Sequence, residues 1–350
     1  MVDLKEVFEK MEFDGTPEDL DYNDRVLLID AMNLFIRNYA AVPAMDDDGN
    51  HIGGMLGFLR SLGVAIRSFK PSRVIIVFDG KGGSQRRRKI FPQYKENRKP
   101  PVRLNRAYDM TTDEEERENM KYQLVTVVNI LEHLPVTVMA LDRVEADDVI
   151  AHLTNLVTMG GGEAIIYSTD KDFLQLASDR CIVYNPVKKK TYDVALIQHE
   201  YGIHPKHFHL FRALDGDKSD NINGVPRVGL KSVLKYIPEF ADPSEDVDMA
   251  LIENKYADAK KVPKMISNIL DNKDLVDRNL QLMDLHDGIM SSDAKMKVAD
   301  RYHKSEIQLD RKGLTEIMMK TRLLSAFPNF NSWLAQNFIP LDKYYNGSET

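Results

Sequence analysis

Apolar residues gather in short runs that are typical of buried β-strands. Three runs cover residues 25–29 (RVLLI), 72–78 (SRVIIVF) and 163–167 (EAIIY). Runs of this length without polar alternation are typical of strands that are covered on both faces of a parallel sheet. A fourth, shorter run at residues 135–139 (PVTVM) also predicts a strand.

Apolar residues with helical spacing separate these runs. The spacing predicts helices around residues 32–39 and at 55–69, 113–133 and 145–157. The helix at 113–133 has an acid-rich start, which favours a helix N-terminus. Strands that alternate with helices in this way predict an α/β fold with a mostly parallel central sheet and helices on both faces.

The strand pattern stops after about residue 200, and the chain from there to about residue 330 has mainly helical spacing. We therefore expect a second, helical region beside the sheet domain. The predicted parts are an acidic leader at 1–24, an α/β domain at 25–200, a helical region at 201–290 and a helical tail at 291–350.

Composition is ordinary for a globular protein, with 43% hydrophobic and 29% charged residues. No stretch approaches the roughly 18 apolar residues that a membrane helix requires. The single cysteine, Cys181, excludes an internal disulfide and a multi-cysteine zinc site. The acidic first residues are typical of neither a secretory signal nor a transit peptide, so we expect a cytoplasmic protein.

The net charge of −7 is unevenly distributed. Residues 1–24 alone carry a net charge of −7, so the remaining chain is balanced. Within that remainder, residues 81–106 hold ten Lys and Arg against one acid, Glu96. Such a basic block predicts a phosphate-binding surface, and a merely solvated basic loop is the alternative.

Carboxylates follow the predicted strands. Asp30 comes directly after the first strand, Asp79 after the second, and Asp170 and Asp172 just after the third. The carboxyl ends of parallel strands share one edge of a sheet, where ligands bind. Three more acids open the helix that follows the fourth strand: Glu145, Asp147 and Asp148.

Each of these acids alone is equally typical of a turn or a helix cap. Several carboxylates that converge repel one another strongly unless they are protonated or neutralised. All-oxygen ligands select hard divalent cations such as Mg²⁺ or Mn²⁺. The number of acids indicates two metal ions, or one ion and a water-bridged shell, and paired ions are typical of phosphodiester cleavage.

A second motif lies in the helical region, at residues 213–233 (ALDGDKSDNINGVPRVGLKSV). It adds two acids, Asp217 and Asp220, and a turn, GVPRVG at 224–229, between two amphipathic helical segments. A turn of this kind can present backbone N–H groups to a phosphate, although a plain structural turn is the alternative.

The motifs LLIDAMN, IIVFDG, FPQYKENR, VEADDVIA, STDKDFLQL and GDKSDNINGVPRVGLKSV resemble, in this order, the 5′-nuclease or flap endonuclease superfamily. The resemblance covers roughly residues 25–240. Length, helical tail and the lack of a polymerase domain make the chain most similar to the ribonuclease H-type exonucleases of T-even bacteriophages. The resemblance implies a PIN/5′-nuclease-like fold with a helix–three-turn–helix motif, and a host-cytoplasmic location for a phage protein.

The resemblance also implies a metal site for two Mg²⁺ ions, with Mn²⁺ as a substitute. It assigns five acids to the first ion or its water shell: Asp30, Asp79, Glu145, Asp147 and Asp148. It assigns four acids to the second ion: Asp170, Asp172, Asp217 and Asp220.

Further residues match the superfamily's contacts with nucleic acid. Residues 81–125 correspond to a gateway and arch, in which Lys95 and Arg98 match the cations at the scissile phosphate. The GVPRVG turn corresponds to a duplex-binding hairpin that takes a potassium ion, although Arg227 replaces its usual second glycine. The expected nucleic-acid contacts are Arg37, Arg88, Lys89, Tyr94, Gly224, Val225, Arg227, Gly229, Lys231 and Ser232.

The resemblance implies a Mg²⁺-dependent 5′→3′ exonuclease and flap endonuclease that acts on duplex DNA and RNA–DNA hybrids and removes primers in lagging-strand replication. A single-stranded DNA-binding protein or a sliding clamp is the expected protein partner, for which the segment around Trp333 is one candidate and core packing of that segment the alternative. Two alternatives stay open: a catalytically silent, structure-specific DNA-binding protein, and a haloacid-dehalogenase-type phosphatase suggested by Asp170-x-Asp172. The sequence leaves open which of flap, nick, gap or hybrid is preferred.

Overall fold

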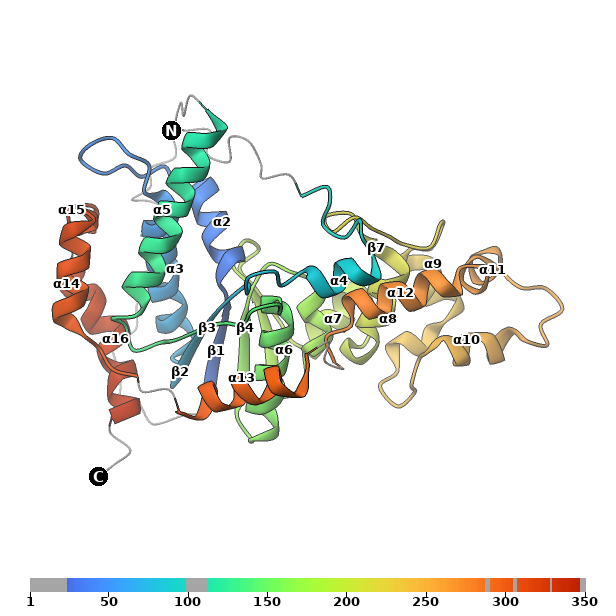
Figure 1. Cartoon of the computed structure of the whole chain (residues 1–350). Helices are drawn as coiled ribbons and strands as arrows, with labels where there is room; N and C mark the ends of the chain where they lie inside the picture. Colours follow the sequence, from blue (N-terminus) through green and yellow to red (C-terminus); the bar gives the residue numbers. More distant parts are fainter. Residues whose placement is uncertain (1–23, 99–111, 287–289, 305–306, 328, 347–350) are drawn as a thin grey trace. The chain divides into compact units, whose positions relative to one another are not determined.

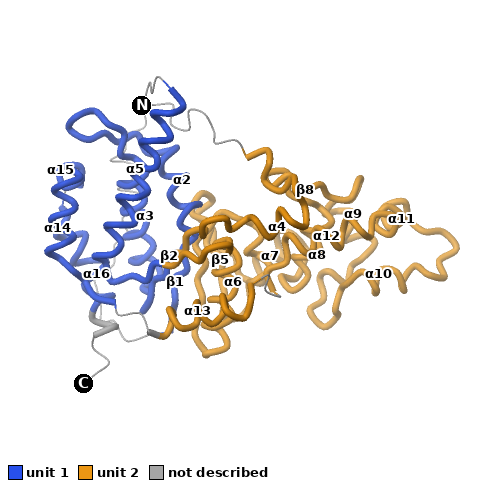
Figure 2. The backbone as a smooth tube through the Cα atoms, viewed as in Figure 1, with its two compact units in different colours: residues 1–76, 102–138, 304–350 blue, residues 77–101, 139–303 orange. Residues whose placement is uncertain are grey.

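The computed structural model of the chain describes residues 24–98, 112–286, 290–304, 307–327 and 329–346 (Figure 1). It consists of two compact units (Figure 2). Unit 1 comprises residues 1–76, 102–138 and 304–350, and unit 2 comprises residues 77–101 and 139–303. The predicted leader, apart from Asp24, and residues 99–111 of the predicted arch lie outside the described residues.

Six strands form one mostly parallel sheet in the order β3-β2-β1-β4-β5-β6 (Figure 1). The α/β fold predicted from the sequence is therefore confirmed. In unit 2, β4 pairs with β5 in parallel, with Ala164 opposite Cys181, and β5 pairs with β6 in antiparallel. The strands are β1 (Arg25–Asp30), β2 (Arg73–Phe78), β3 (Thr137–Ala140), β4 (Glu163–Tyr167), β5 (Cys181–Asn185) and β6 (Lys190–Tyr192).

The sequence pattern missed four of the strands. In β5 only Cys181 and Val183 are buried, and β6 has three residues of which only Tyr192 is buried. Strands this short and this exposed carry no long apolar run. The expectation that strands stop after about residue 200 was also wrong in one place, because β7 (Gly216–Asp217) and β8 (Ile222–Asn223) form a small antiparallel pair.

The helices of unit 1 pack around α3, which contacts α2, α5 and α16. A capping box starts α5, since the Thr112 hydroxyl accepts from the Glu115 amide and the Glu115 carboxylate accepts from the Thr112 amide. The helices are α2 (Ala31–Ala41), α3 (Gly53–Phe69), α5 (Asp113–Leu131), α14 (Arg311–Lys320), α15 (Leu323–Ala326) and α16 (Phe330–Asn346).

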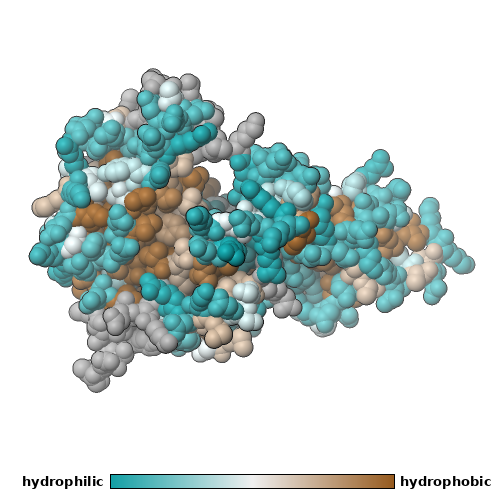
Figure 3. Space-filling model, viewed as in Figure 1, coloured by the Kyte–Doolittle hydropathy of each residue, from teal (hydrophilic) through white to brown (hydrophobic). Residues whose placement is uncertain are grey.

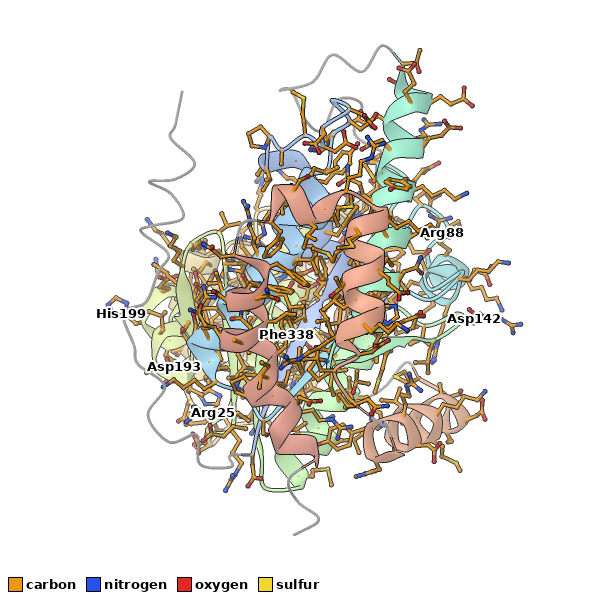
Figure 4. The ribbon with its side chains drawn as sticks, turned by 90° about the vertical axis from the view of Figure 1, so that its left-hand side faces the viewer. Arg25, Arg88, Asp142, Asp193, His199 and Phe338 are labelled. Atoms are coloured by element: carbon orange, nitrogen blue, oxygen red, sulfur yellow. The ribbon has the colours of Figure 1, made fainter. Side chains whose placement is uncertain are left out.

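The C-terminal helix α16 belongs to the core of unit 1. Trp333 is buried against the rings of Phe327, Phe330 and Phe338, and Phe338 is fully buried (Figure 4). The indole of Trp333 therefore has a packing role, which is the alternative that the sequence offered to a docking role.

In unit 2, α6 packs on β4, and α12 packs on α8 and α4. A Cβ atom at Gly80, directly after Asp79, would lie 1.5 Å from the carbonyl oxygen of Leu141, so this close approach requires glycine. The helices are α4 (Gln85–Ile90), α6 (Ala146–Met159), α7 (Val194–Tyr201), α8 (Phe208–Asp215), α9 (Leu230–Tyr236), α10 (Met249–Tyr256), α11 (Lys264–Asp271), α12 (Lys273–Met283) and α13 (Ser292–Lys304). Three 3₁₀ turns complete the unit: η1 (Asp172–Leu176), η2 (Pro205–His207) and η3 (Pro238–Ala241).

On the face shown in Figure 3, the surface of unit 2 is mostly hydrophilic, with scattered hydrophobic side chains. Among the described residues, no helix has the length and apolar character needed to cross a membrane.

Candidate active site

A buried arginine organises the first group of acids in unit 2. Arg87 on α4 contacts Glu145 and forms two hydrogen bonds of 2.8 Å with Asp148. Its Nε donates to the carbonyl of Leu282 at 2.8 Å. Glu145 is the N-cap residue of α6 but makes no capping hydrogen bond, so its carboxylate is available to side-chain partners. Arg87 thus joins α4, α6 and the end of α12.

Lys95 and Tyr94 complete the surroundings of Glu145. The Lys95 ammonium forms an ion pair with one carboxylate oxygen of Glu145, and the Tyr94 hydroxyl donates to the other at 3.2 Å. Burial opposes ionisation of Glu145, but the charges of Arg87 and Lys95 hold its pKa below the usual value. Burial opposes protonation of Lys95, yet Glu145 and neighbouring acids raise its pKa. Both groups are therefore charged at neutral pH.

The backbone around Lys95 lies against the loop that carries Asp220. The Lys95 amide donates to the carbonyl of Asp220 at 2.9 Å, and Lys95 has a left-handed φ of 57°. Arg98 forms an ion pair with the Asp220 carboxylate, while its own side chain stays half exposed. A non-glycine residue in this conformation persists only where its surroundings fix it. The contacts with Asp220 supply that constraint, and they place two cations beside the acids.

The second group of acids begins at the end of β4. The Asp170 amide donates to the Ser168 hydroxyl at 3.1 Å, and the Asp170 carboxylate accepts from the Asp172 amide at 2.9 Å. This local turn leads into η1 and keeps both carboxylates close together. Burial and the charge of Asp172 raise the pKa of Asp170 to about 7. Burial also raises the pKa of Asp172, against the opposing charge of Arg212.

Arg212 on α8 bridges the second group. Its Nε donates to Asp172 at 2.6 Å, and one of its terminal nitrogens donates to Asp217 at 2.6 Å. The Asp217 carboxylate also accepts from the Ser219 amide and hydroxyl, each at 2.6 Å. Burial opposes its ionisation, but these hydrogen bonds and Arg212 hold the pKa of Asp217 below the usual value.

The other predicted acids have definite places. Asp79 follows β2 and accepts from the Ala146 amide at 2.9 Å, so it caps α6 beside Glu145. Asp147 lies in the first turn of α6 and interacts electrostatically with Lys95 and Arg98. Asp30 belongs to unit 1, where it ends β1 and caps α2 by accepting from the Asn33 amide at 3.1 Å.

Unit 2 thus brings together eight of the nine predicted metal-binding acids. Asp220 interacts electrostatically with Lys95 and with Asp170 and Asp172, which links the two groups. These eight acids outnumber the four cations that pair with members of the group (Arg87, Lys95, Arg98 and Arg212), and a further acid, Asp215, lies 3.8 Å from Arg212.

Among the described residues, no group of three or more acidic, histidine or cysteine side chains has an arrangement that could hold a metal ion. The four cations contact several of these carboxylates instead. The donors are all oxygen, which fits Mg²⁺ or Mn²⁺. Burial, and secondly the charge of the neighbouring Asp172, raise the pKa of Asp170, as expected for carboxylates that are held close together. The donor set therefore fits a divalent cation, provided that some carboxylates exchange a side-chain partner for it.

Two residues of this site, Arg87 and Arg212, were not predicted from the sequence. Arg87 stands in the basic run QRRRKI but lies three residues before Ile90 and four before Phe91, on the helix face that packs inward. Arg212 interrupts the apolar segment Leu210–Leu214. A charged residue at a core-facing position is the signal that could have revealed both.

The residues predicted to contact nucleic acid have varied surroundings. Arg88 and Lys89 are exposed on α4, with Arg88 at the surface in Figure 4. Tyr94 is only 3% exposed, beside Glu145. Arg227 is exposed and has a left-handed φ of 65°. Arg37 lies on α2 of unit 1. Gly224, Val225 and Gly229 lie in the segment that joins α8 to α9, and Lys231 and Ser232 lie in the first turn of α9. Their contacts with nucleic acid stay predictions.

The α/β fold, with acids at the ends of its strands, is compatible with an enzyme of the 5′-nuclease class, and the family comparison identifies that class. Residues 25–202, about half of the chain, match the family described as 5′-3′ exonuclease, N-terminal resolvase-like domain. The chain belongs to this family, and the resemblance to the 5′-nuclease superfamily is confirmed. The protein is therefore a nuclease.

Similar proteins agree with this assignment. The 5′-3′ exonuclease of Buchnera aphidicola subsp. Acyrthosiphon pisum (strain APS) is 29% identical over 245 residues, which are 69% of this chain and 77% of that relative. DNA polymerase I of Bacillus subtilis (strain 168) is 28% identical over 253 residues, 71% of this chain but 26% of the polymerase. The flap endonuclease of bacteriophage T5, in a complex with DNA and metal ions, has a similar fold, with a TM-score of 0.59, 21% identity and coverage of 86% of this chain and 99% of that chain.

Proposed function

We propose that the protein is a Mg²⁺-dependent 5′→3′ exonuclease and flap endonuclease. Its substrates would be duplex DNA and RNA–DNA hybrids with a free 5′ end or a 5′ flap, and its role the removal of RNA primers during lagging-strand replication. The observation that carries the proposal is the group of eight carboxylates in unit 2, which outnumber the four cations that pair with members of the group.

Metal binding follows from the same acids. Asp79, Glu145, Asp147 and Asp148, with Asp30 of unit 1, would hold or hydrate the first ion. The second ion would take Asp170, Asp172, Asp217 and Asp220. When bound, divalent cations supply activated water and neutralising charge for phosphodiester hydrolysis, and Mn²⁺ would substitute for Mg²⁺.

Lys95 and Arg98 are the residues of this chain that would act on the reacting phosphate. Lys95 is held beside Glu145 and Asp220, and Arg98 reaches Asp220 from a half-exposed position. Cations fixed in this way stabilise the charge that develops on phosphoryl oxygens. The P–O bond to the 3′ oxygen of the neighbouring nucleotide breaks, water supplies the new oxygen, and the downstream product keeps a 5′-phosphate.

Duplex binding would involve the segment between α8 and α9, together with the exposed cations of α4. Gly224 approaches the backbone of Asp215 closely, since a Cβ atom would lie 2.2 Å from the carbonyl oxygen of Asp215. This contact fixes the turn that precedes Arg227, where a potassium ion is proposed. Contacts of this kind read the sugar–phosphate backbone, so binding should be salt-sensitive and largely independent of sequence.

We propose a cytoplasmic nuclease, acting in the host cytoplasm if the chain comes from a T-even-like phage. Its protein partner would be a single-stranded DNA-binding protein or a sliding clamp.

The experiment that tests the proposal uses duplex DNA with a labelled 5′-flapped strand, incubated with Mg²⁺ or with EDTA. We expect cleavage in Mg²⁺ but not in EDTA, either near the junction or stepwise from the 5′ end. Asp293→Asn, which changes an exposed acid on α13 outside the group of eight carboxylates, should cleave like the wild type. Salt-sensitive binding without cleavage would instead indicate a silent DNA-binding protein.

A further inference from the structure

Arg212 has a hydrogen-bond partner for each nitrogen of its guanidinium. Nε donates to Asp172 Oδ1 at 2.6 Å, and one terminal nitrogen donates to Asp217 Oδ2 at 2.6 Å. The other terminal nitrogen donates to the carbonyl of Gly216 at 3.1 Å and lies 3.8 Å from a carboxylate oxygen of Asp215. The side chain is 8% exposed, so water screens these interactions weakly.

Arg212 also completes the engagement of Asp217. Asp217 Oδ1 accepts from the Ser219 amide and hydroxyl at 2.6 Å and from the Asp220 amide at 3.3 Å. Asp217 Oδ2 accepts from Arg212. Both oxygens are therefore engaged, and a metal ion that binds Asp217 has to compete with one of these donors.

The position of Arg212 in α8 is unfavourable for a charge without a partner. Its neighbours in sequence, Leu210, Phe211, Ala213 and Leu214, are all buried. Burying a charge in such surroundings costs several kcal/mol unless a counter-ion compensates for it. The guanidinium thus needs Asp172 and Asp217 as counter-ions, and it is the cation that pairs with both of these acids.

We propose that Arg212 is a positioning residue that serves as the resident counter-ion of Asp172 and Asp217 and competes with a divalent cation for them. The inference rests on the proposed function, which assigns both acids to the second metal ion. A guanidinium is a rigid planar fork with a permanent charge, so it fixes two carboxylates at a set separation without metal. A divalent cation replaces it only by displacing these hydrogen bonds.

Removing Arg212 has opposite effects on folding and on metal binding. Without the guanidinium, Asp172 and Asp217 repel each other, which destabilises the metal-free protein. The same loss removes a positive charge from the metal site and frees two carboxylate oxygens, which strengthens the attraction for a cation. An arginine with a purely structural role would give weaker folding and weaker metal binding together.

The test is calorimetric titration of Mn²⁺ into the full-length, metal-free protein, with melting temperatures measured in EDTA and in Mn²⁺. Arg212→Gln should melt lower in EDTA and bind Mn²⁺ more tightly at its weaker site, on the order of tenfold. Arg212→Lys keeps the charge without the fork and should give a smaller increase in affinity. Arg278→Gln is the matched control in unit 2, because Arg278 stacks on Phe91 and bonds Asn279; it should bind Mn²⁺ like the wild type.

An Mn²⁺ affinity of folded Arg212→Gln equal to or below that of the wild type would overturn the inference. If that variant does not fold without metal, Arg212→Lys carries the test, and an affinity at or below the wild-type value overturns it equally. A wild-type protein that binds no Mn²⁺ at all would instead overturn the proposed function, and the role of Arg212 with it.

Discussion

Arg87 holds Asp148 through two parallel hydrogen bonds, each 2.8 Å long, at a place where the arginine side chain is only 3% exposed. The same guanidinium contacts Glu145. Burial opposes the charge of Arg87, but Asp148 and Glu145 raise its pKa well above the usual value. A site with an excess of acids thus contains a buried cation that holds two of them in place.

Replacing Arg87 should therefore destabilise the fold strongly. Arg87→Met leaves Asp148 buried without its bidentate partner, and we expect the free energy of unfolding to fall by about 3–5 kcal/mol. Arg88→Met, which changes the exposed neighbour on α4, should change it by less than about 0.5 kcal/mol. Urea unfolding in EDTA measures both values, and equal stability of the two variants would refute a structural role for Arg87.

The stability of the metal-free protein should depend on the protonation of Asp170. Its pKa is raised from 3.8 to about 7, so the folded state prefers the protonated form. The stability contributed by Asp170 is fully present below the unfolded-state pKa and is lost as the pH rises through about 7.

Asp170→Asn mimics the protonated form, so its stability advantage over the wild type should grow as the pH rises from about 4 to about 8. Unfolding free energies measured in EDTA across this range provide the check. Asp142→Asn, at an exposed position, is the control. A stability difference that stays constant across the range would show that Asp170 has an ordinary pKa.

Lys95 should affect cleavage far more than folding. Glu145 keeps Arg87 as a partner when Lys95 is removed, so Lys95→Ala should still fold. Loss of a fixed cation at the reacting phosphate should lower the single-turnover cleavage rate by about 10²–10³-fold. Lys297→Ala, an exposed lysine on α13, should cleave like the wild type. An unchanged rate for Lys95→Ala would remove Lys95 from the reaction.

Arg227 offers a way to separate backbone strain from binding. A left-handed φ at a residue other than glycine costs roughly 1–2 kcal/mol, so Arg227→Gly should not lower the free energy of unfolding. The substitution should nevertheless weaken duplex binding. It should also reduce the salt dependence of that binding by about one phosphate contact. Arg143→Gly is a matched control, because Arg143 has a similar φ of 64° outside the α8–α9 segment. Salt titrations of binding compare the two, and equal weakening in both would contradict a specific contact by Arg227.

The sequence predicted three of the strands that lie inside the sheet, and with them the acids that follow those strands, but it missed the interior strand β5. Continuous apolar runs mark β1, β2 and β4. Once a strand is predicted, an acid next to its carboxyl end is placed at the edge of the sheet by its position in the sequence alone. The edge strand β6 was not predicted, because only one of its three residues, Tyr192, is buried and no apolar run marks the strand.

Charge pairing was much harder to predict. Arg87 pairs with Glu145 and Asp148, which are 58 and 61 residues away in the sequence, and Arg212 pairs with Asp172, which is 40 residues away. A basic residue in sequence gives no sign of which acid it will meet after folding. The acids of the site were therefore predictable, but the cations that hold them in the metal-free protein were not.

The most direct test of the whole proposal compares flap cleavage by the wild type and by Asp172→Asn at equal protein concentration in Mg²⁺, with duplex binding measured in parallel. We expect the wild type to cleave, and the variant to bind the flapped duplex with similar affinity but to leave it intact. Cleavage by Asp172→Asn at the wild-type rate would contradict the claim that the acids of unit 2 form the active site.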